Sequence, residues 1–279
     1  MWWKQSTRFC SITLVESALA VPQIVRLETD HMMHGRKQRK VVGVIQARMA
    51  STRLPGKVME QILDRPMLSW VVERLQSATL LDEVIVATTQ QSQDDIIVSL
   101  CQAQEIPCFR GSEADVLDRY YLAARRHNAD VVVRVTSDCP LIDSGIVDKV
   151  VQVFLAADVD YASNTVIDTY PRGLDAEVLT FAALERAHRD ATRIYQREHV
   201  TPYIYENPSQ FRILSVTAEA DYSSHRWTVD TAEDLALVRA IYQRLGSGGT
   251  FREILNLVDK HPELSEMNSS ISQKALREA

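Results

Sequence analysis

The side chains best suited to chemistry lie in one loop, Arg48 to Lys57, with the sequence RMASTRLPGK. It combines the cations of Arg48, Arg53 and Lys57 with two hydroxyl residues and with Gly56, which allows close backbone approach. Arginine forks and a lysine ammonium are well suited to hold a triphosphate. The spacing does not fit a Walker-type loop, in which glycines precede the lysine and Ser or Thr follows it. The loop therefore predicts a different phosphate site, with a solvated basic loop as the alternative.

Two aspartates follow apolar segments farther along the chain. Asp138 ends the segment that starts at residue 130, just before Pro140, which stops strand pairing. Asp230 stands between the apolar residues 226–229 and an expected helix. Mg²⁺ takes one or two protein carboxylates together with phosphate oxygens and water, so Asp138 and Asp230 could hold metal ions that bridge the phosphates. Turn-forming or helix-capping roles are the alternatives for both.

An alternation of strand-like and helix-like segments positions these residues. Val- and Ile-rich runs alternate with amphipathic stretches from Val41 onward. Uniformly apolar strands are covered on both faces, so the predicted class is α/β, with a mostly parallel sheet between helices. Ligands of such sheets bind at the carboxyl ends of the strands. We expect strands over 41–46, 83–88, 131–136, 211–216 and 226–229, and helices over 67–77, 94–104, 115–127, 146–157, 181–189, 196–206, 232–245 and 251–258.

The chain is expected to have three parts. Residues 1–40 differ in character from the rest, and we expect an N-terminal extension that is disordered or loosely attached. Residues 41–271 form the main domain, with an insertion at about 163–210 that covers the sheet as a lid or dimerisation region. Residues 272–279 form a tail. Thr231 and Asp234 predict a capping box at the start of the helix over 232–245.

Composition narrows the functional classes. The net charge of −6 argues against sequence-independent binding of nucleic acid, which relies on many lysines and arginines. No apolar run approaches the roughly 18–20 residues of a membrane-spanning helix, so we expect no membrane partner. The four cysteines show no metal-like spacing, and we expect reduced thiols in a cytosolic protein.

The loop from Gln46 to Lys57, the Asp138-Cys139-Pro140 turn and the Val229-Asp230-Thr231 helix start occur in this order in the sugar cytidylyltransferases, which the chain resembles over about residues 41–271. The spore-coat polysaccharide branch is most similar, and the 3-deoxy-manno-octulosonate and acylneuraminate cytidylyltransferases are more distant. The supporting stretches are 109–113, 115–121, 171–178, 197–203 and 261–264.

The resemblance implies a three-layer nucleotide-diphospho-sugar transferase fold, which is Rossmann-like. It also implies a reaction of CTP with a sugar or sugar acid to give the CMP-linked sugar and pyrophosphate, with Mg²⁺ as cofactor, in surface polysaccharide or glycan biosynthesis. We expect a homodimer. Two departures from the spore-coat pattern are Ala50, where glycine is usual, and the turn Asp64-Arg65-Pro66. The alternatives are a nucleotidyltransferase or glycosyltransferase of this fold with another donor, and a non-catalytic nucleotide-binding partner.

Site roles follow from the resemblance position by position. Asp138 and Asp230 would hold the metal, and Arg48, Lys57 and Asp138 would be the catalytic residues. The nucleotide would contact Gln46, Ala47, Arg48, Ser51, Arg53, Lys57 and Ser137.

The candidate acceptor-binding residues lie in the inserted stretch. Arginine suits the carboxylate of an acidic sugar, and His199 is a candidate general base or a buried hydrogen-bonding group. The alternative is a structural network in which Asp175 and Glu177 pair with Arg172 or Arg197. The candidates are Arg172, Glu177, Arg197 and His199.

Overall fold

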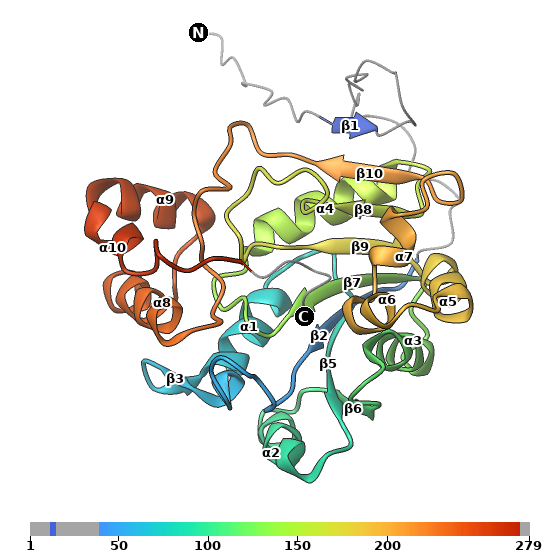
Figure 1. The fold of residues 1–279 in the computed structure, drawn as a ribbon, viewed down its shortest axis with the longest axis horizontal. Coiled ribbons are helices and arrows are strands. Elements are labelled where there is room, and N and C mark those ends of the chain that lie inside the picture. The colour runs from blue at the N-terminus through green and yellow to red at the C-terminus, as the bar shows by residue number, and fades with distance from the viewer. Residues whose placement is uncertain (1–11, 15–38, 274–279) are drawn as a thin grey trace, which may run out of the picture.

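The computed structural model describes residues 12–14 and 39–273, and a single large sheet forms its centre (Figure 1). The expectations for residues 1–40 and for the tail fall mostly outside these ranges. The eight strands follow the order β1-β10-β8-β9-β7-β2-β5-β6. Their bounds are β1 Ile12–Leu14, β2 Val41–Gln46, β5 Glu83–Thr89, β6 Cys108–Gly111, β7 Val131–Thr136, β8 Tyr161–Ser163, β9 Glu177–Thr180 and β10 Ile213–Val216.

The strand directions confirm the mostly parallel sheet. Strands β6, β5, β2 and β7 run parallel to one another, and β8 runs parallel to β10. Only β9 and the edge strand β1 run antiparallel to the strands beside them. Because β2 and β7 are adjacent and parallel, the segments that follow them leave the sheet at the same edge.

Helices cover both faces, which confirms the three-layer α/β class. On one face α1 (Met67–Gln76), α2 (Asp95–Ala103) and α4 (Ser144–Ala156) pack on side chains such as Val133. On the other, α3 (Val116–Arg126), α5 (Phe181–Asp190) and α7 (Pro202–Tyr205) pack on side chains such as Val132. Successive strand residues point to opposite faces, so both faces of these strands are apolar. No helix within the described ranges has the length and hydropathy of a membrane span.

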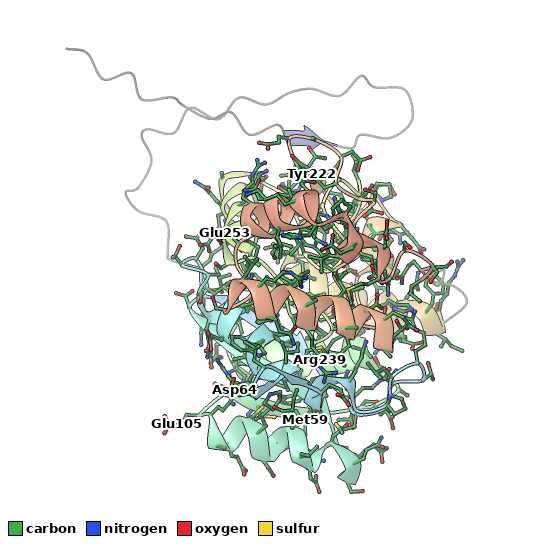
Figure 2. All side chains as sticks on the ribbon, turned by 90° about the vertical axis from the view of Figure 1, so that its left-hand side faces the viewer. Met59, Asp64, Glu105, Tyr222, Arg239 and Glu253 are labelled. Atoms are coloured by element: carbon green, nitrogen blue, oxygen red, sulfur yellow. The ribbon has the colours of Figure 1, made fainter. Side chains whose placement is uncertain are left out.

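Three further helices gather at one end of the sheet, in orange and red in Figure 1. They are α8 (Ala232–Leu245), α9 (Phe251–Lys260) and α10 (Pro262–Glu266). Helix α8 lies against the hairpin of β3 (Gln61–Ile62) and β4 (Arg65–Pro66), and Figure 2 labels Arg239 of the helix and Asp64 of the hairpin turn. Arg239 Nε donates to the Gln61 carbonyl at 2.7 Å. The helix that follows Asp230 is thereby tied to the segment that follows Lys57.

The predicted capping box of α8 is confirmed. Thr231 Oγ1 accepts from the Asp234 N–H at 3.3 Å, and Asp234 Oδ2 accepts from the Thr231 N–H at 3.1 Å. Both contacts satisfy backbone donors that a helix start leaves unpaired.

Three sequence predictions were wrong in detail. Residues 226–229 form no strand, because their backbone bonds to loops: Trp227 N–H donates to the Arg172 carbonyl and Val229 N–H to that of Asp138. The helix expected over 196–206 is two helices, α6 (Ile194–His199) and α7, divided at Val200, whose φ is 74°. The stretch of about 163–210 contributes β9 to the sheet itself, between β7 and β8, in addition to helices beside it.

Candidate active site

Lys57 joins the two candidate metal ligands. It begins the 3-10 helix η1 (Lys57–Met59), and its Nζ lies 3.0 Å from Asp138 Oδ2 and 2.8 Å from Asp230 Oδ1. The same ammonium donates to the Val229 carbonyl at 2.8 Å. The structure therefore brings together three residues that sequence reasoning selected from three separate segments.

The charges of this cluster stabilise one another. Burial disfavours the charged form of Lys57, but Asp138 and Asp230 outweigh burial and raise its pKa. Burial likewise favours the neutral form of Asp138, but the Lys57 ammonium and a hydrogen bond from Thr136 lower its pKa to about 2. Both groups are thus charged near neutral pH.

The turn at Asp138 is fixed from two sides. Thr136 Oγ1 donates to Asp138 Oδ1 at 2.5 Å, which leaves Oδ2 for Lys57. The Asp138 carbonyl accepts from Val229 N–H at 2.8 Å and from Thr228 Oγ1 at 3.0 Å. The segment leading to Asp230 therefore packs directly on the turn that carries Asp138.

Asp230 has two further cationic neighbours. Its Oδ2 lies 2.8 Å from Arg53 Nη2 and 2.8 Å from Arg226 Nη2. Arg226 is in turn held by Asp234, whose Oδ1 lies 3.0 Å from Arg226 Nε. Arg226 was not predicted as part of the site, because a spacing of four residues brings side chains together only on a helix, and residues 226–230 are not helical.

The rest of the 48–57 loop is closed on itself. The Met49 carbonyl accepts from Gly56 N–H at 2.9 Å, and Ser51 Oγ accepts from Leu54 N–H at 3.4 Å. Gly56 has a φ of 73°, in the left-handed region that favours glycine. Within residues 12–14 and 39–273, no hydrogen bond or ion pair engages the guanidinium of Arg48. Its charge is therefore available to an anionic ligand.

The other candidate nucleotide-binding residues lie at the same edge of the sheet. Ser137 N–H donates to the Gln46 carbonyl at 3.1 Å, and Ala47 N–H donates to the Ala87 carbonyl at 3.1 Å. The Gln46 side chain accepts from Arg134 Nη2 at 3.3 Å. These residues continue the ends of β2 and β7, next to Lys57 and Asp138.

Two of the candidate acceptor residues, Glu177 and Arg197, are engaged by partners other than those of the alternative structural network. Glu177 is 4% exposed and accepts from Tyr161 Oη at 2.5 Å and Thr201 Oγ1 at 2.6 Å, beside an ion pair with Arg134.

Arg197 pairs with Asp115, the N-cap of α3, at 2.5 Å. The alternative pairing of Glu177 with Arg172 or Arg197 therefore does not occur, because Arg134 on β7 pairs with Glu177 and Asp115 at the start of α3 pairs with Arg197. His199 lies half-buried in the last turn of α6. The acceptor roles of these residues stay predictions.

Gly173 brings the loop that carries Arg172 against the Asp138 region. Its φ is 104°, and a Cβ there would lie 2.6 Å from the backbone of both Trp227 and Thr228. We expect Gly173→Ala to lower the free energy of unfolding by about 3 kcal/mol, since strain and a backbone clash add. Gly246→Ala is the control, because its φ is 69° with nothing within 4 Å; it should cost only about 1 kcal/mol. Equal losses in urea denaturation would contradict the close packing.

Asp175 is a titratable group of this region that the candidate set left out. Burial, with the charges of Asp138 and Glu177, raises its pKa to about 6 against the opposing effect of Arg172. A carboxyl whose pKa is higher in the folded state contributes stability below its unfolded pKa, and that contribution is lost as the pH rises to about 6.

We expect Asp175→Asn to raise the free energy of unfolding at pH 7.5 by about 1–2 kcal/mol, because Asp175 is only half-buried, and to change it little at pH 4. Urea denaturation in EDTA at both pH values measures this. A gain of equal size at both pH values would show that the carboxyl charge is not the cause.

The chemistry of the donor set suits Mg²⁺. Asp138 and Asp230 come from separate segments, and each places a carboxylate oxygen within 3.0 Å of one cationic nitrogen. Among the described residues there is no cluster of three or more His, Cys, Asp or Glu that could hold a metal. A magnesium ion held here would use these two carboxylates and complete its coordination with phosphate oxygens and water.

Comparison with known proteins assigns a family to this arrangement. The family model described as cytidylyltransferase matches residues 42–255. A protein of Methanocaldococcus jannaschii named as uncharacterized is 42% identical over 242 residues, which covers 86% of this chain and 98% of that protein. The spore coat polysaccharide biosynthesis protein SpsF of Bacillus subtilis is 32% identical over 232 residues, covering 80% of this chain and 95% of SpsF.

Solved structures agree. A cytidylyltransferase from Leptospira borgpetersenii superposes with a TM-score of 0.80 at 35% identity, over 84% of this chain and all of that one (100%). The CMP:2-keto-3-deoxy-manno-octonic acid synthetase complexed with CTP has a TM-score of 0.58 at 21% identity, over 74% of this chain and 99% of that one, and shares the fold. The chain belongs to the cytidylyltransferase family of nucleotidyltransferases.

Proposed function

We propose that the protein transfers CMP from CTP to a hydroxyl group of a sugar or sugar acid, with Mg²⁺ as cofactor, and releases pyrophosphate. The observation that carries the proposal is the cluster of Lys57, Asp138 and Asp230, which Arg53 joins through Asp230, on the loop that also carries Arg48. A triphosphate needs several cations, and a magnesium ion needs carboxylates; this edge of the sheet offers both.

The reaction needs no covalent intermediate with the protein. The acceptor oxygen forms a bond to the α-phosphorus while the bond from that phosphorus to the β-phosphate oxygen breaks, and the hydroxyl proton is released to solvent. Catalysis is then positioning and charge neutralisation. Magnesium held by Asp138 and Asp230 would neutralise charge on the phosphate oxygens.

The protein's own cations take the remaining charge. Arg48 is not engaged by another described residue and would bind phosphate oxygens directly. Lys57 stays an ammonium near neutral pH because its pKa is raised. Arg53, Ser51, Gln46, Ala47 and Ser137 would complete the nucleotide site.

The acceptor is proposed from the relatives and from residues near Asp138. Several 3-deoxy-manno-octulosonate cytidylyltransferases match part of the chain, such as that of Bdellovibrio bacteriovorus, 36% identical over 119 residues. Their names specify a sugar acid, and SpsF is named for polysaccharide biosynthesis. Arg172, next to Gly173, is the candidate for an acceptor carboxylate.

We expect a cytosolic homodimer. Ile194, at the start of α6 in the inserted stretch, is a large apolar side chain that is 85% exposed, and we propose that the dimer contact covers it. Light scattering of the full chain should give a molar mass twice that of one chain.

The cytosolic location is supported by the described cysteines, Cys101, Cys108 and Cys139, which are free thiols and suit a reducing compartment.

Thermal shifts with CTP, UTP, GTP and ATP in Mg²⁺ test the donor, because a ligand that binds the folded state raises apparent stability. We expect the largest shift with CTP. If another triphosphate gave a larger shift than CTP, that triphosphate would be the proposed donor in place of CTP. Mass spectrometry of products from CTP and a panel of sugar acids then identifies the acceptor.

A further inference from the structure

A buried carboxylate lies beneath the 48–57 loop. Asp94 is the last residue of the 3-10 helix η2 (Ser92–Asp94) and is 0% exposed. Its Oδ1 accepts from Met49 N–H at 2.7 Å, and its Oδ2 accepts from Thr89 Oγ1. No direct ion-pair contact reaches Asp94 among the described residues, but the buried guanidinium of Arg119 lies close enough to interact with its charge. Burying a carboxylate costs free energy unless it is hydrogen-bonded and paired, so the two hydrogen bonds and the Arg119 charge together offset the cost of burying Asp94.

The contact falls at the base of the 48–57 loop. The N–H that Asp94 holds belongs to the peptide bond between Arg48 and Met49, which sets the direction in which the Arg48 side chain leaves the backbone. The Met49 carbonyl accepts from Gly56 N–H at 2.9 Å, so both polar backbone groups of Met49 are fixed. The Met49 side chain packs on the core. Met49 therefore anchors the loop, and Asp94 anchors Met49.

The turn that carries Asp94 is itself held firmly. Asp94 N–H donates to the Gln91 carbonyl at 3.0 Å, and Gln91 N–H donates to Thr89 Oγ1 at 3.1 Å. Arg110, from β6, donates to the Thr89 carbonyl at 2.8 Å and to that of Gln91 at 2.9 Å. The Asp94 carboxylate therefore belongs to a turn whose backbone is held by several hydrogen bonds.

We propose that Asp94 is a positioning residue that holds the Arg48–Met49 peptide in the orientation needed to bind the triphosphate. The proposal rests on the proposed function, because it takes a nucleoside triphosphate as the ligand of the loop. Charge repulsion alone predicts the opposite change in affinity. A carboxylate near a polyanion weakens its binding, so removal of Asp94 would strengthen triphosphate binding if repulsion were its only effect. A loss of triphosphate affinity on removal of Asp94 is therefore specific to positioning.

Calorimetric titration of the full chain with CTP and with CMP in Mg²⁺ tests the positioning role of Asp94. The measured quantity is the preference for CTP, defined as the dissociation constant of CMP divided by that of CTP. Asp94→Ala should reduce the preference for CTP about tenfold, since a hydrogen bond to a charged group is lost. Asp94→Asn keeps the acceptor oxygen and should restore the preference to within about twofold of wild type. The control is Asp143→Ala, which removes a carboxylate that is 8% exposed and accepts from the N–H groups of Ile146 and Phe251. It should lower the melting temperature and leave the preference unchanged.

A preference at or above the wild-type value in Asp94→Ala would overturn the proposal, as would a value in Asp94→Asn as low as in Asp94→Ala. If Asp94→Ala does not fold, Thr89→Val is measured instead, because it removes the hydroxyl that donates to Asp94 Oδ2. A fall of about threefold in the preference for CTP would support the positioning role, and an unchanged preference would contradict it. If wild type binds no CTP, the cytidylyl proposal fails on its own, and the same ratio is measured with the triphosphate and monophosphate that it does bind.

Discussion

Replacing Lys57 with methionine should lower kcat/KM for CTP by about 10³-fold, because the change removes a cation from the site where phosphate charge must be stabilised. Methionine keeps much of the volume of the lysine stem, so the effect belongs to the ammonium. Pyrophosphate release at varied CTP concentration measures it. Lys57→Arg keeps the charge but cannot reproduce three contacts from one nitrogen, so we expect only partial recovery.

Lys57→Met should also destabilise the fold. It leaves Asp138 and Asp230 facing each other without the ammonium between them. Breaking a buried ion pair costs several kcal/mol, but the Asp138 side chain is 26% exposed, so we expect a loss of about 2 kcal/mol. Magnesium should restore part of that stability if the two carboxylates bind it. A Lys57→Met protein with wild-type turnover would remove Lys57 from the site.

Asp138→Asn and Asp230→Asn should each lower kcat/KM by about 10²–10³-fold and raise the Mg²⁺ concentration that gives half-maximal rate. The amide keeps the shape of the side chain but removes the charge that a magnesium ion requires. Asp230→Asn should also raise KM for CTP, because Arg53 and Arg226 lose their shared partner.

The matched control is Asp148→Asn. This carboxylate on α4 accepts from the N–H groups of Thr79 and Leu80, both at 2.9 Å, at a place separate from the 48–57 loop. It should leave the rate and the magnesium dependence unchanged. If the double variant of Asp138 and Asp230 released pyrophosphate at the wild-type rate, the two carboxylates would have no part in the reaction. Unchanged function of that double variant in cells would favour a non-catalytic binding role.

The sequence predicted the central cluster because its members follow elements with clear patterns. Lys57 and Asp138 come after the apolar strands β2 and β7, and parallel neighbours deliver their following loops to one edge of the sheet. Asp230 was also expected there, although the preceding strand does not exist. Its place is set instead by the bonds of residues 228 and 229 to Asp138.

The supporting residues could not be predicted in the same way. Asp94 lies 45 positions from Met49, and the contact is a single hydrogen bond from the Met49 N–H to the Asp94 side chain. Such a contact produces no periodic pattern of residue types in the sequence. Glu177 and Arg197 were selected for their chemistry and for their place in the inserted stretch, but a side chain in a sheet or helix bonds to whatever the tertiary fold places beside it. For these two residues the partners are Arg134 and Asp115.

The most direct test of the central claim is a titration of the wild-type protein with CTP in the presence and absence of Mg²⁺, followed by an assay for pyrophosphate with a panel of sugar acids. We expect CTP binding that magnesium strengthens, and pyrophosphate released only when an accepted sugar acid is present. A protein that bound no nucleoside triphosphate in magnesium would contradict the assignment of the 48–57 loop, Asp138 and Asp230 to a nucleotidyl-transfer site.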